Sequence, residues 1–402
     1  MARRRATPGA RAPRSLALAS VLLVTLAGCA MTLPGLGAPP RPWAAAAAAV
    51  EVDPFEAYVS DRLDSMTLEQ KIASLLMIHV AGPDAGPIRA AIDATGVAGV
   101  IYMGDNVRSV EQVAATTAAL SADPGLPVLT SIDQEGGIVR RLPDSGPGAS
   151  ELRTQDPSAT QAAFTDRSAL VASAGVSINF GIVADVTASR RSFIYSRTLG
   201  SDAASASPRV AAAVAGELGT VFSTLKHFPG HGSVAGDSHT SVPTTGMGID
   251  EWRATQAPPF QAGIDAGAEF VMLGHLRYSA VDAAPSSLSA AWNSILRDEM
   301  GFDGIIVTDD MVMLENSGEP AYADQAANAV ASIAAGTTLL LYVGPVDVGN
   351  IVASVAAAVR DGRILEATIN DAARRLLELR REMSGISGPY IHCGDPCRTL
   401  VD

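Results

Sequence analysis

Short apolar segments alternate with alanine-rich helical segments along most of this 402-residue chain, and this alternation restricts the fold more than any other feature. Each apolar run is continuous, as expected for a strand that is covered on both faces. Strands separated by helices predict a parallel sheet. We expect strands within residues 97–103, 126–133, 176–186, 221–227, 269–275, 304–310 and 337–343.

The expected helices carry ordinary start signals. Thr67, followed three residues later by Gln70, predicts a capping box at the start of a helix that leads into a first strand by residue 78. A barrel and an open, doubly wound sheet both fit this alternation, so the pattern alone does not distinguish them. Further helices are expected over residues 110–120, 324–336 and 364–383.

Size and charge narrow the class of protein. A (β/α)8 barrel takes about 250 residues, and insertions add to this number, so a single catalytic domain over residues 51–385 accounts for most of the chain. With 29 basic and 42 acidic residues, the formal net charge is -13. No nucleic-acid partner is therefore expected, because binding phosphates requires a clustered positive surface.

The first 28 residues predict a targeting segment rather than part of the fold. Five arginines precede an apolar stretch from about Leu16 to Leu26, which is the order found in secretory signals. That stretch is shorter than the roughly 20 residues that span a membrane. The tetrapeptide LAGC, ending at Cys29, resembles a bacterial lipobox and implies a lipid anchor on Cys29. The alternative is an ordinary cleaved signal with a chance cysteine.

Two further segments flank the expected domain. Residues 29–50 are rich in Pro, Gly and Ala and lack a hydrophobic period, so we expect a linker. Residues 386–402 form a tail with Cys393 and Cys397, for which a small disulfide is expected outside the cytoplasm. A metal clip that includes His392 is the alternative, although two thiols and one imidazole make an incomplete site.

The stretch from Lys226 to Pro243, KHFPGHGSVAGDSHTSVP, holds the densest group of chemically active side chains. It follows the apolar run at residues 221–225, so its first residues should end a buried strand and the rest should form a loop. In α/β barrels, reacting groups sit at the carboxyl ends of strands. Asp237 precedes His239 by two residues, so its carboxylate can hold one imidazole nitrogen and turn the other toward a substrate.

This stretch closely resembles the signature of the β-N-acetylhexosaminidases of glycoside hydrolase family 3, in which KHFPGHG is followed by an Asp-Ser-His triplet. The resemblance covers roughly residues 52–385 and implies a (β/α)8 TIM barrel without a cofactor or a metal. It also implies His239 as general acid/base, Asp237 as its partner, and Asp309 in IIVTDDM as nucleophile. Two other interpretations of the stretch are a zinc cluster, which needs fixed ligand geometry, and a structural loop without catalysis.

The same resemblance implies residues that bind the sugar outside this stretch. Asp133 and Arg141, in DQEGGIVRRL, correspond to a sugar-binding aspartate and arginine of the family. Ile138 stands where the family often has arginine. Arg197 corresponds to another sugar-binding arginine, although the match around it is looser. A structural turn at residues 133–142 is the alternative for this segment.

Lys226 and His227 lie inside the signature, and both can donate hydrogen bonds to ring hydroxyls. Met272 and His275 end a predicted strand and should line the pocket. Asp310 adjoins the expected nucleophile, but adjacent side chains on a strand point to opposite faces. We therefore expect Asp310 to bond to the backbone or to support its neighbour.

The expected activity is retaining exo-hydrolysis of terminal β-linked N-acetylglucosamine (GlcNAc) from cell-wall muropeptides or other glycans. The enzyme is expected to be a monomer, lipid-anchored outside the cytoplasm. A β-glucosidase or a phosphorylase of the same family is the alternative enzyme, and a sugar-binding lipoprotein is the alternative without catalysis. The sequence does not decide between water and phosphate as acceptor.

Overall fold

The computed structural model describes residues 53–121 and 123–386. The expected leader and linker, with Cys29, and the cysteine pair Cys393 and Cys397 lie outside the described residues, so the lipid anchor and the disulfide stay predictions. Among the helices within those two ranges, none is both long and apolar enough to cross a membrane.

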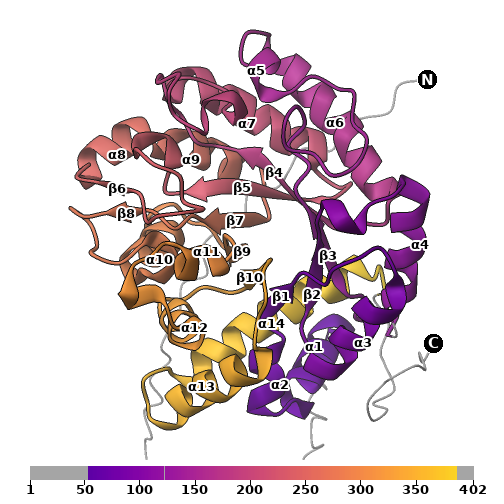
Figure 1. Ribbon diagram of the computed structural model, residues 1–402. Coiled ribbons are helices and arrows are strands. Elements are labelled where there is room, and N and C mark those ends of the chain that lie inside the picture. Colours follow the sequence, from indigo (N-terminus) through magenta and orange to yellow (C-terminus); the bar gives the residue numbers. More distant parts are fainter. Residues whose placement is uncertain (1–52, 122, 387–402) are drawn as a thin grey trace, which may run out of the picture. The chain divides into compact units, whose positions relative to one another are not determined.

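Eight parallel strands form a ring, which decides between the two folds that the alternation allows (Figure 1). The hydrogen-bonded order runs β10-β1-β2-β3-β4-β5-β7-β9. A parallel bridge between Val307 and Leu339 then joins the two ends of this order. The prediction of a barrel is confirmed, and an open sheet is excluded. The strands are β1 (Leu76–Ile78), β2 (Gly99–Tyr102), β3 (Leu129–Ile132), β4 (Ile178–Val183), β5 (Phe222–Phe228), β7 (Phe270–Leu273), β9 (Ile305–Thr308) and β10 (Leu340–Tyr342).

Each expected strand is present, but most are shorter than the apolar run that predicted them. Residues 176–186 yield only Ile178–Val183, whose register with β5 ends at the pair Val183 and Lys226, and the apolar run continues into the loop. A separate pair of short parallel strands, β6 (Thr244–Thr245) and β8 (Arg277–Tyr278), lies beyond the barrel wall.

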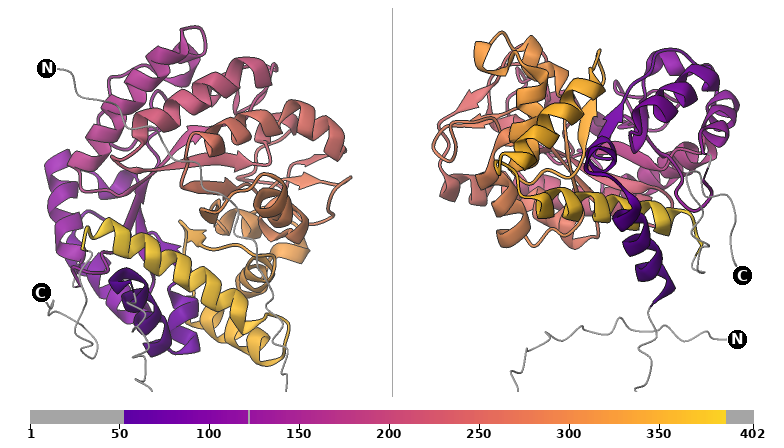
Figure 2. Two further views of the ribbon diagram at one scale, coloured as in Figure 1. Left: turned by 180° about the vertical axis from the view of Figure 1, so that it is seen from behind. Right: turned by 90° about the horizontal axis from the view of Figure 1, so that it is seen from below.

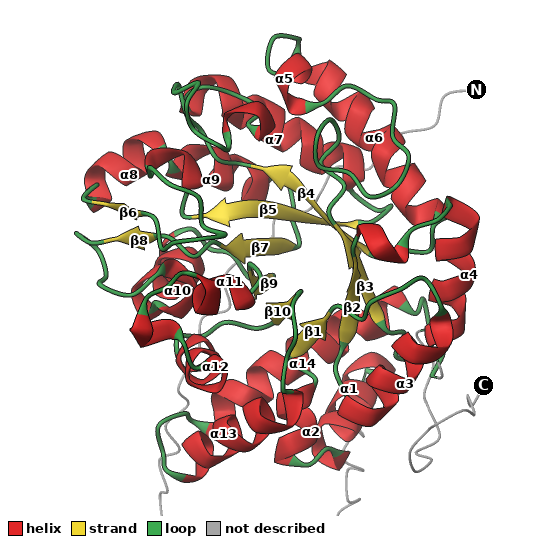
Figure 3. Cartoon of the chain, viewed as in Figure 1, coloured by secondary structure: helices red, strands yellow, loops and turns green. Residues whose placement is uncertain are grey.

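Helices surround the barrel on its outer side, as Figures 2 and 3 show. The capping box is confirmed: Thr67 accepts a hydrogen bond from the Gln70 N–H, and the Gln70 side chain bonds back to the Thr67 N–H. The last helix begins at Glu366, two residues later than expected, and packs on α1 and α2. The helices are α1 (Pro54–Ser65), α2 (Leu68–Ala73), α3 (Ala85–Thr95), α4 (Val110–Leu120), α5 (Ala149–Leu152), α6 (Pro157–Ser173), α7 (Ala203–Glu217), α8 (Ile249–Thr255), α9 (Ala257–Asp265), α10 (Ala290–Ser294), α11 (Val312–Asn316), α12 (Gln325–Ala334), α13 (Val348–Arg360) and α14 (Glu366–Met383).

An aromatic cluster packs behind the end of β5 and fixes the loop that starts there. The ring of Phe228 meets Trp252, Phe260 and Trp292 edge to face, at centroid distances of 5.7, 5.3 and 5.7 Å. Such pairs add about 0.5–1.5 kcal/mol each beyond their buried area. The indole N–H of Trp252 also donates to the Pro229 carbonyl at 2.7 Å. Core packing thus holds the chain where the histidine-rich stretch leaves the strand.

A small polar group lies buried inside the barrel wall. The Asn179 amide nitrogen donates to the Gln134 carbonyl at 3.1 Å and to Glu217 Oε1 at 2.5 Å. Burial raises the pKa of Glu217 to about 8, although the hydrogen bond from Asn179 works in the other direction. Glu217 is therefore largely protonated at neutral pH.

We expect Glu217→Gln to change how stability depends on pH. The pKa of Glu217 is higher in the native state than in the unfolded state, so protonated Glu217 stabilises the native state fully below the unfolded-state pKa. This stabilisation is lost as pH rises toward the native pKa of about 8. Glutamine cannot ionise, so the free energy of unfolding of the variant should rise relative to wild type between about pH 5 and 8, by at least about 1.4 kcal/mol. Urea unfolding at a series of pH values measures this difference. A difference that stays constant over that range would contradict the assignment.

Candidate active site

Polar residues from several strand ends meet at the carboxyl end of the barrel. Asp133 follows β3, Lys226 and His227 lie near the end of β5, Met272 lies in β7, and Asp309 follows β9. These strand ends enclose a cavity of about 200 Å³. All of the residues that the sequence assigns to catalysis or sugar binding line it, with the exception of Asp237: Asp133, Arg141, Arg197, Lys226, His227, His239, Met272 and Asp309.

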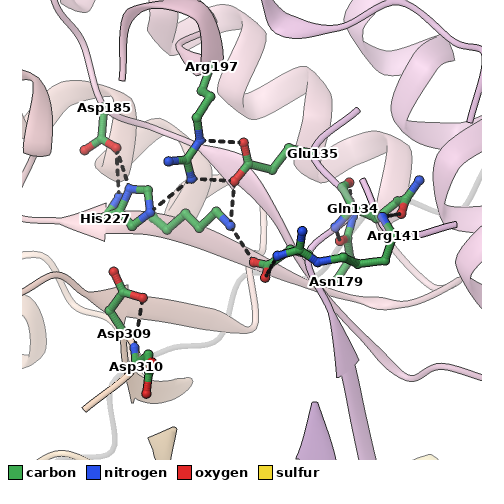
Figure 4. Close-up of polar contacts among 11 residues, drawn as sticks. Gln134, Glu135, Arg141, Asn179, Asp185, Arg197, His227, Asp309 and Asp310 are labelled. Atoms are coloured by element: carbon green, nitrogen blue, oxygen red, sulfur yellow. Dashed lines mark hydrogen bonds and ion pairs between the residues drawn. The ribbon is translucent and has the colours of Figure 1, made fainter. Parts of the chain in front are cut away.

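A buried ammonium group is the centre of one set of charges. Lys226 Nζ lies 2.9 Å from Asp133 Oδ1 and 2.7 Å from Glu135 Oε1, and the lysine is 2% exposed. Arg141 Nη2 lies 3.1 Å from Asp133 Oδ2. Arg197 forms a two-pronged pair with Glu135, at 2.6 and 2.9 Å (Figure 4). Two carboxylates and three cations are thus interleaved in one network.

This network keeps its members ionised. Burial works against the charge of Asp133, but Lys226 and Arg141 outweigh it and lower its pKa to about 2. Burial likewise opposes the charge of Glu135, and Lys226 and Arg197 lower its pKa. For Lys226, Asp133 and Glu135 outweigh burial and raise the pKa. Asp133 is 18% exposed and can still accept hydrogen bonds from a ligand.

Asp185, two residues beyond β4, organises a second set of contacts. It is fully buried and accepts hydrogen bonds from His227 Nδ1 at 2.7 Å, the His227 N–H at 3.2 Å and the His231 N–H at 2.6 Å. Burial opposes its charge, but His227 outweighs burial and lowers the pKa of Asp185. Arg197 Nη2 lies 3.3 Å from His227 Nε2. Both ring nitrogens of His227 thus face protein groups, and its expected role as a donor to the sugar stays a prediction.

Asp237 and His239 form the expected dyad. Asp237 Oδ1 lies 2.5 Å from His239 Nδ1 and 3.0 Å from the His239 N–H. Slight burial opposes the charge of Asp237, and the hydrogen bonds from His239 lower its pKa. Both side chains are exposed, at 46% and 62%. The carboxylate thus fixes Nδ1 as a donor and leaves Nε2 as the nitrogen that can exchange a proton.

Asp309 and Asp310 occupy different environments. Asp309 Oδ1 accepts the Asp310 N–H at 2.9 Å, whereas Oδ2 has no hydrogen-bond partner in the described part of the chain. Burial opposes its charge, and His227 and His275 outweigh burial and lower the pKa of Asp309. Asp310 Oδ1 accepts the N–H groups of Val312 and Val343 at 3.1 and 2.9 Å, so it bonds to the backbone as expected. Burial and the neighbouring Asp309 raise the pKa of Asp310 to about 6.

Met272 and His275 differ in their relation to the cavity. Met272 is 2% exposed and lines the cavity wall. His275 does not line it, which contradicts the expectation. Its Nδ1 lies 2.7 Å from Ser287 Oγ and its Nε2 lies 2.8 Å from the Asp310 carbonyl, so both nitrogens face protein groups behind the wall.

A larger cavity, of about 600 Å³, lies at the opposite end of the barrel. Its lining includes Ser74, Gly96 and Leu126, which precede β1, β2 and β3. Barrel enzymes carry their active sites at the carboxyl ends of the strands. The smaller cavity is therefore the candidate active site, since it also gathers the ionised residues.

Comparison with known proteins identifies the family. Residues 67–379 match the family described as "Glycosyl hydrolase family 3 N terminal domain". The chain belongs to glycosyl hydrolase family 3. A β-hexosaminidase from Stenotrophomonas maltophilia (strain R551-3) is 36% identical over 260 residues, which cover 60% of this chain and 75% of the relative.

Solved structures of family 3 enzymes share this fold. A β-N-acetylhexosaminidase from Beutenbergia cavernae has a TM-score of 0.71 and 33% identity, with 79% of this chain and 99% of that chain covered. A β-N-acetylglucosaminidase from Paenibacillus has a TM-score of 0.74 and 30% identity, with 83% of this chain and 66% of that chain covered. The sequence-based assignment to this family of glycoside hydrolases is thus confirmed.

Two residues of this family 3 site were missed in the sequence. Glu135 was passed over within DQEGG, although a second carboxylate so close to Asp133 was a signal for a buried cation nearby. Asp185 ends the apolar run at residues 176–186, which is the position from which a barrel residue reaches the site. Both residues act by holding others, as Figure 4 shows.

Proposed function

We propose that this family 3 hydrolase is a retaining exo-β-N-acetylglucosaminidase, which removes terminal, non-reducing GlcNAc from cell-wall muropeptides or other glycans. One observation carries the proposal: the same small cavity is lined by Asp309, with a free carboxylate oxygen, and by His239, oriented by Asp237. Double displacement needs such a nucleophile together with an acid/base. The names of the β-hexosaminidase and β-N-acetylglucosaminidase relatives support the choice of sugar.

In the first step, Asp309 Oδ2 attacks the anomeric carbon as the bond to the leaving oxygen breaks. His239, starting as imidazolium, gives its Nε2 proton to that oxygen. In the second step, Nε2 takes a proton from water, whose oxygen attacks the anomeric carbon and frees the Asp309 carboxylate. Asp237 keeps its hydrogen bond to Nδ1 in both steps and stabilises the imidazolium.

The charged network provides groups that suit a single sugar. Asp133 can accept hydrogen bonds from ring hydroxyls, and Lys226 has one N–H donor left beyond the two that face Asp133 and Glu135. The cavity, at about 200 Å³, is smaller than the roughly 300–1,000 Å³ that holds a drug-sized ligand. This size favours one sugar ring and therefore removal from the end of a chain.

Product analysis with the disaccharide GlcNAc-MurNAc tests the proposed activity. We expect free GlcNAc to be released as the β-anomer. The rate of release should be the same with and without phosphate. GlcNAc 1-phosphate would indicate a phosphorylase, and turnover of glucosides alone would indicate a β-glucosidase. Binding without turnover would indicate a sugar-binding protein and would rule out the proposal.

A matched pair of substitutions tests the nucleophile. Asp309→Asn removes the attacking carboxylate and should lower turnover of an activated aryl β-GlcNAc by at least about 10⁴-fold, because covalent catalysis is lost. Asp310→Asn keeps Oδ1 as an acceptor for Val312 and Val343 and should retain most of the activity. A fluorinated slow substrate followed by peptide mapping should label Asp309. Label on Asp310 would move the assignment by one residue.

The acid/base role of His239 is tested by varying the leaving group. His239→Ala should slow cleavage of the disaccharide by about 10² to 10⁴-fold, but should affect the glycosylation step of a dinitrophenyl glycoside much less, because that leaving group needs no proton. Azide, which needs no general base, should restore turnover of the activated substrate and give a β-glycosyl azide. Equal losses of activity on both substrates, without rescue by azide, would mean that His239 binds the sugar and does not transfer a proton.

A further inference from the structure

The side chain between the two dyad residues is buried, whereas the dyad itself is exposed. Asp237 and His239 have 46% and 62% of their side chains exposed, and Ser238 is only 2% exposed. Ser238 also lines the active-site cavity. A buried serine in an exposed turn needs a partner for its hydroxyl group.

The turn at residues 237–240 sets the geometry within the dyad, but its own hydrogen bonds do not fix the orientation of the dyad relative to the barrel. Asp237 Oδ1 accepts both the N–H and the Nδ1–H of His239. The Thr240 N–H donates to the Asp237 carbonyl at 3.2 Å, which closes the turn. All of these partners are close neighbours in the sequence. Another contact must fix the whole turn relative to the cavity.

Ser238 makes that contact, with His231. Its Oγ lies 3.0 Å from Nε2 of His231, which is 1% exposed. His231 Nδ1 is buried and has no hydrogen-bond partner among the described residues. Because a buried N–H without an acceptor is rarely tolerated, the proton belongs on Nε2 and is donated to Ser238. Burial lowers the pKa of His231 to about 4, so this ring stays neutral at physiological pH.

His231 is itself fixed to the barrel. Its backbone N–H donates to buried Asp185 at 2.6 Å. Its ring meets Phe193 edge to face at a centroid distance of 4.5 Å and meets His227 at 5.9 Å. The same Phe193 ring lies 6.3 Å from the ring of His239, at an interplanar angle of 86°. A continuous series of contacts therefore leads from the end of β4 to the dyad.

We propose that His231 is a positioning residue for the acid/base, which acts through Ser238 to fix the Asp237–His239 turn so that Nε2 of His239 meets the leaving oxygen. This inference rests on the proposed function, because it requires that His239 transfers a proton. A displacement of about 1 Å in a reacting group can cost 10²-fold in rate. The hydrogen bond from His231 to Ser238 is buried, and it attaches the turn midway between the two dyad residues.

Ser238→Ala tests the proposal, because it removes the hydroxyl and leaves the dyad in place. Its kcat/KM for GlcNAc-MurNAc should fall by about 10- to 100-fold, whereas its kcat/KM for a dinitrophenyl β-GlcNAc should fall by less than about threefold. Thr240→Ala, an exposed position on the same turn, should leave both values near those of wild type. A merely structural role would lower kcat/KM for both substrates by the same factor.

Substitution of His231 gives the second measurement. His231→Leu removes the donor and should reproduce the leaving-group-dependent loss. His231→Gln offers an amide N–H that can reach Ser238, so it should recover at least about a third of the wild-type disaccharide activity. Should His231→Leu fail to fold, the comparison of Ser238→Ala with Thr240→Ala remains decisive.

The outcomes separate this inference from the proposed function. Equal losses on both substrates for Ser238→Ala, or no loss, would overturn the positioning role if His239→Ala still discriminates between leaving groups. If His239→Ala shows no such discrimination, the acid/base assignment itself fails. The selective loss in Ser238→Ala supports the positioning role, and recovery in His231→Gln assigns that role to the contact with His231.

Discussion

A buried ammonium group sets the conditions for the whole site. Lys226 can stay charged inside the barrel because Asp133 and Glu135 lie 2.9 and 2.7 Å from its nitrogen. Two carboxylates around one cation require further positive charge, which Arg141 and Arg197 supply. Removing one partner from such a buried set typically costs 3–5 kcal/mol. The loop after β3, the segment after β4 and the end of β5 are therefore held together before any substrate arrives.

The balance of charge in the cavity suits the proposed chemistry. Four carboxylates whose pKa values are lowered lie together with three cations at the cavity or directly behind it. A glycosidic transition state has oxocarbenium character and gains positive charge. A carboxylate held ionised beside the anomeric carbon, as proposed for Asp309, stabilises this charge more than it stabilises the neutral ground state. The carboxylates are Asp133, Glu135, Asp185 and Asp309, and the cations are Lys226, Arg141 and Arg197.

The sequence predicts residues at strand ends better than it predicts their partners. Asp133 was found because it follows an apolar run, and the family resemblance added its role. Glu135 and Asp185 were missed because their partners, Arg197 and His227, lie 62 and 42 residues further along the chain. Only the closed ring of strands brings such residues together, and the alternation of strands and helices is equally compatible with an open sheet. The long-range pairings therefore could not be read from local patterns.

The two histidines of the loop show why the acid/base lies on an exposed turn. Burial lowers the pKa of His231 to about 4, so a histidine in that environment is neutral and cannot supply the proton of the first step. Exposure of His239 avoids this desolvation, but an exposed side chain on a turn has more conformational freedom to lose when it reacts. Burying Ser238 offsets that freedom without burying the imidazole. The alternation of exposed, buried and exposed side chains in the triplet thus leaves the His239 imidazole exposed while Ser238 fixes its placement.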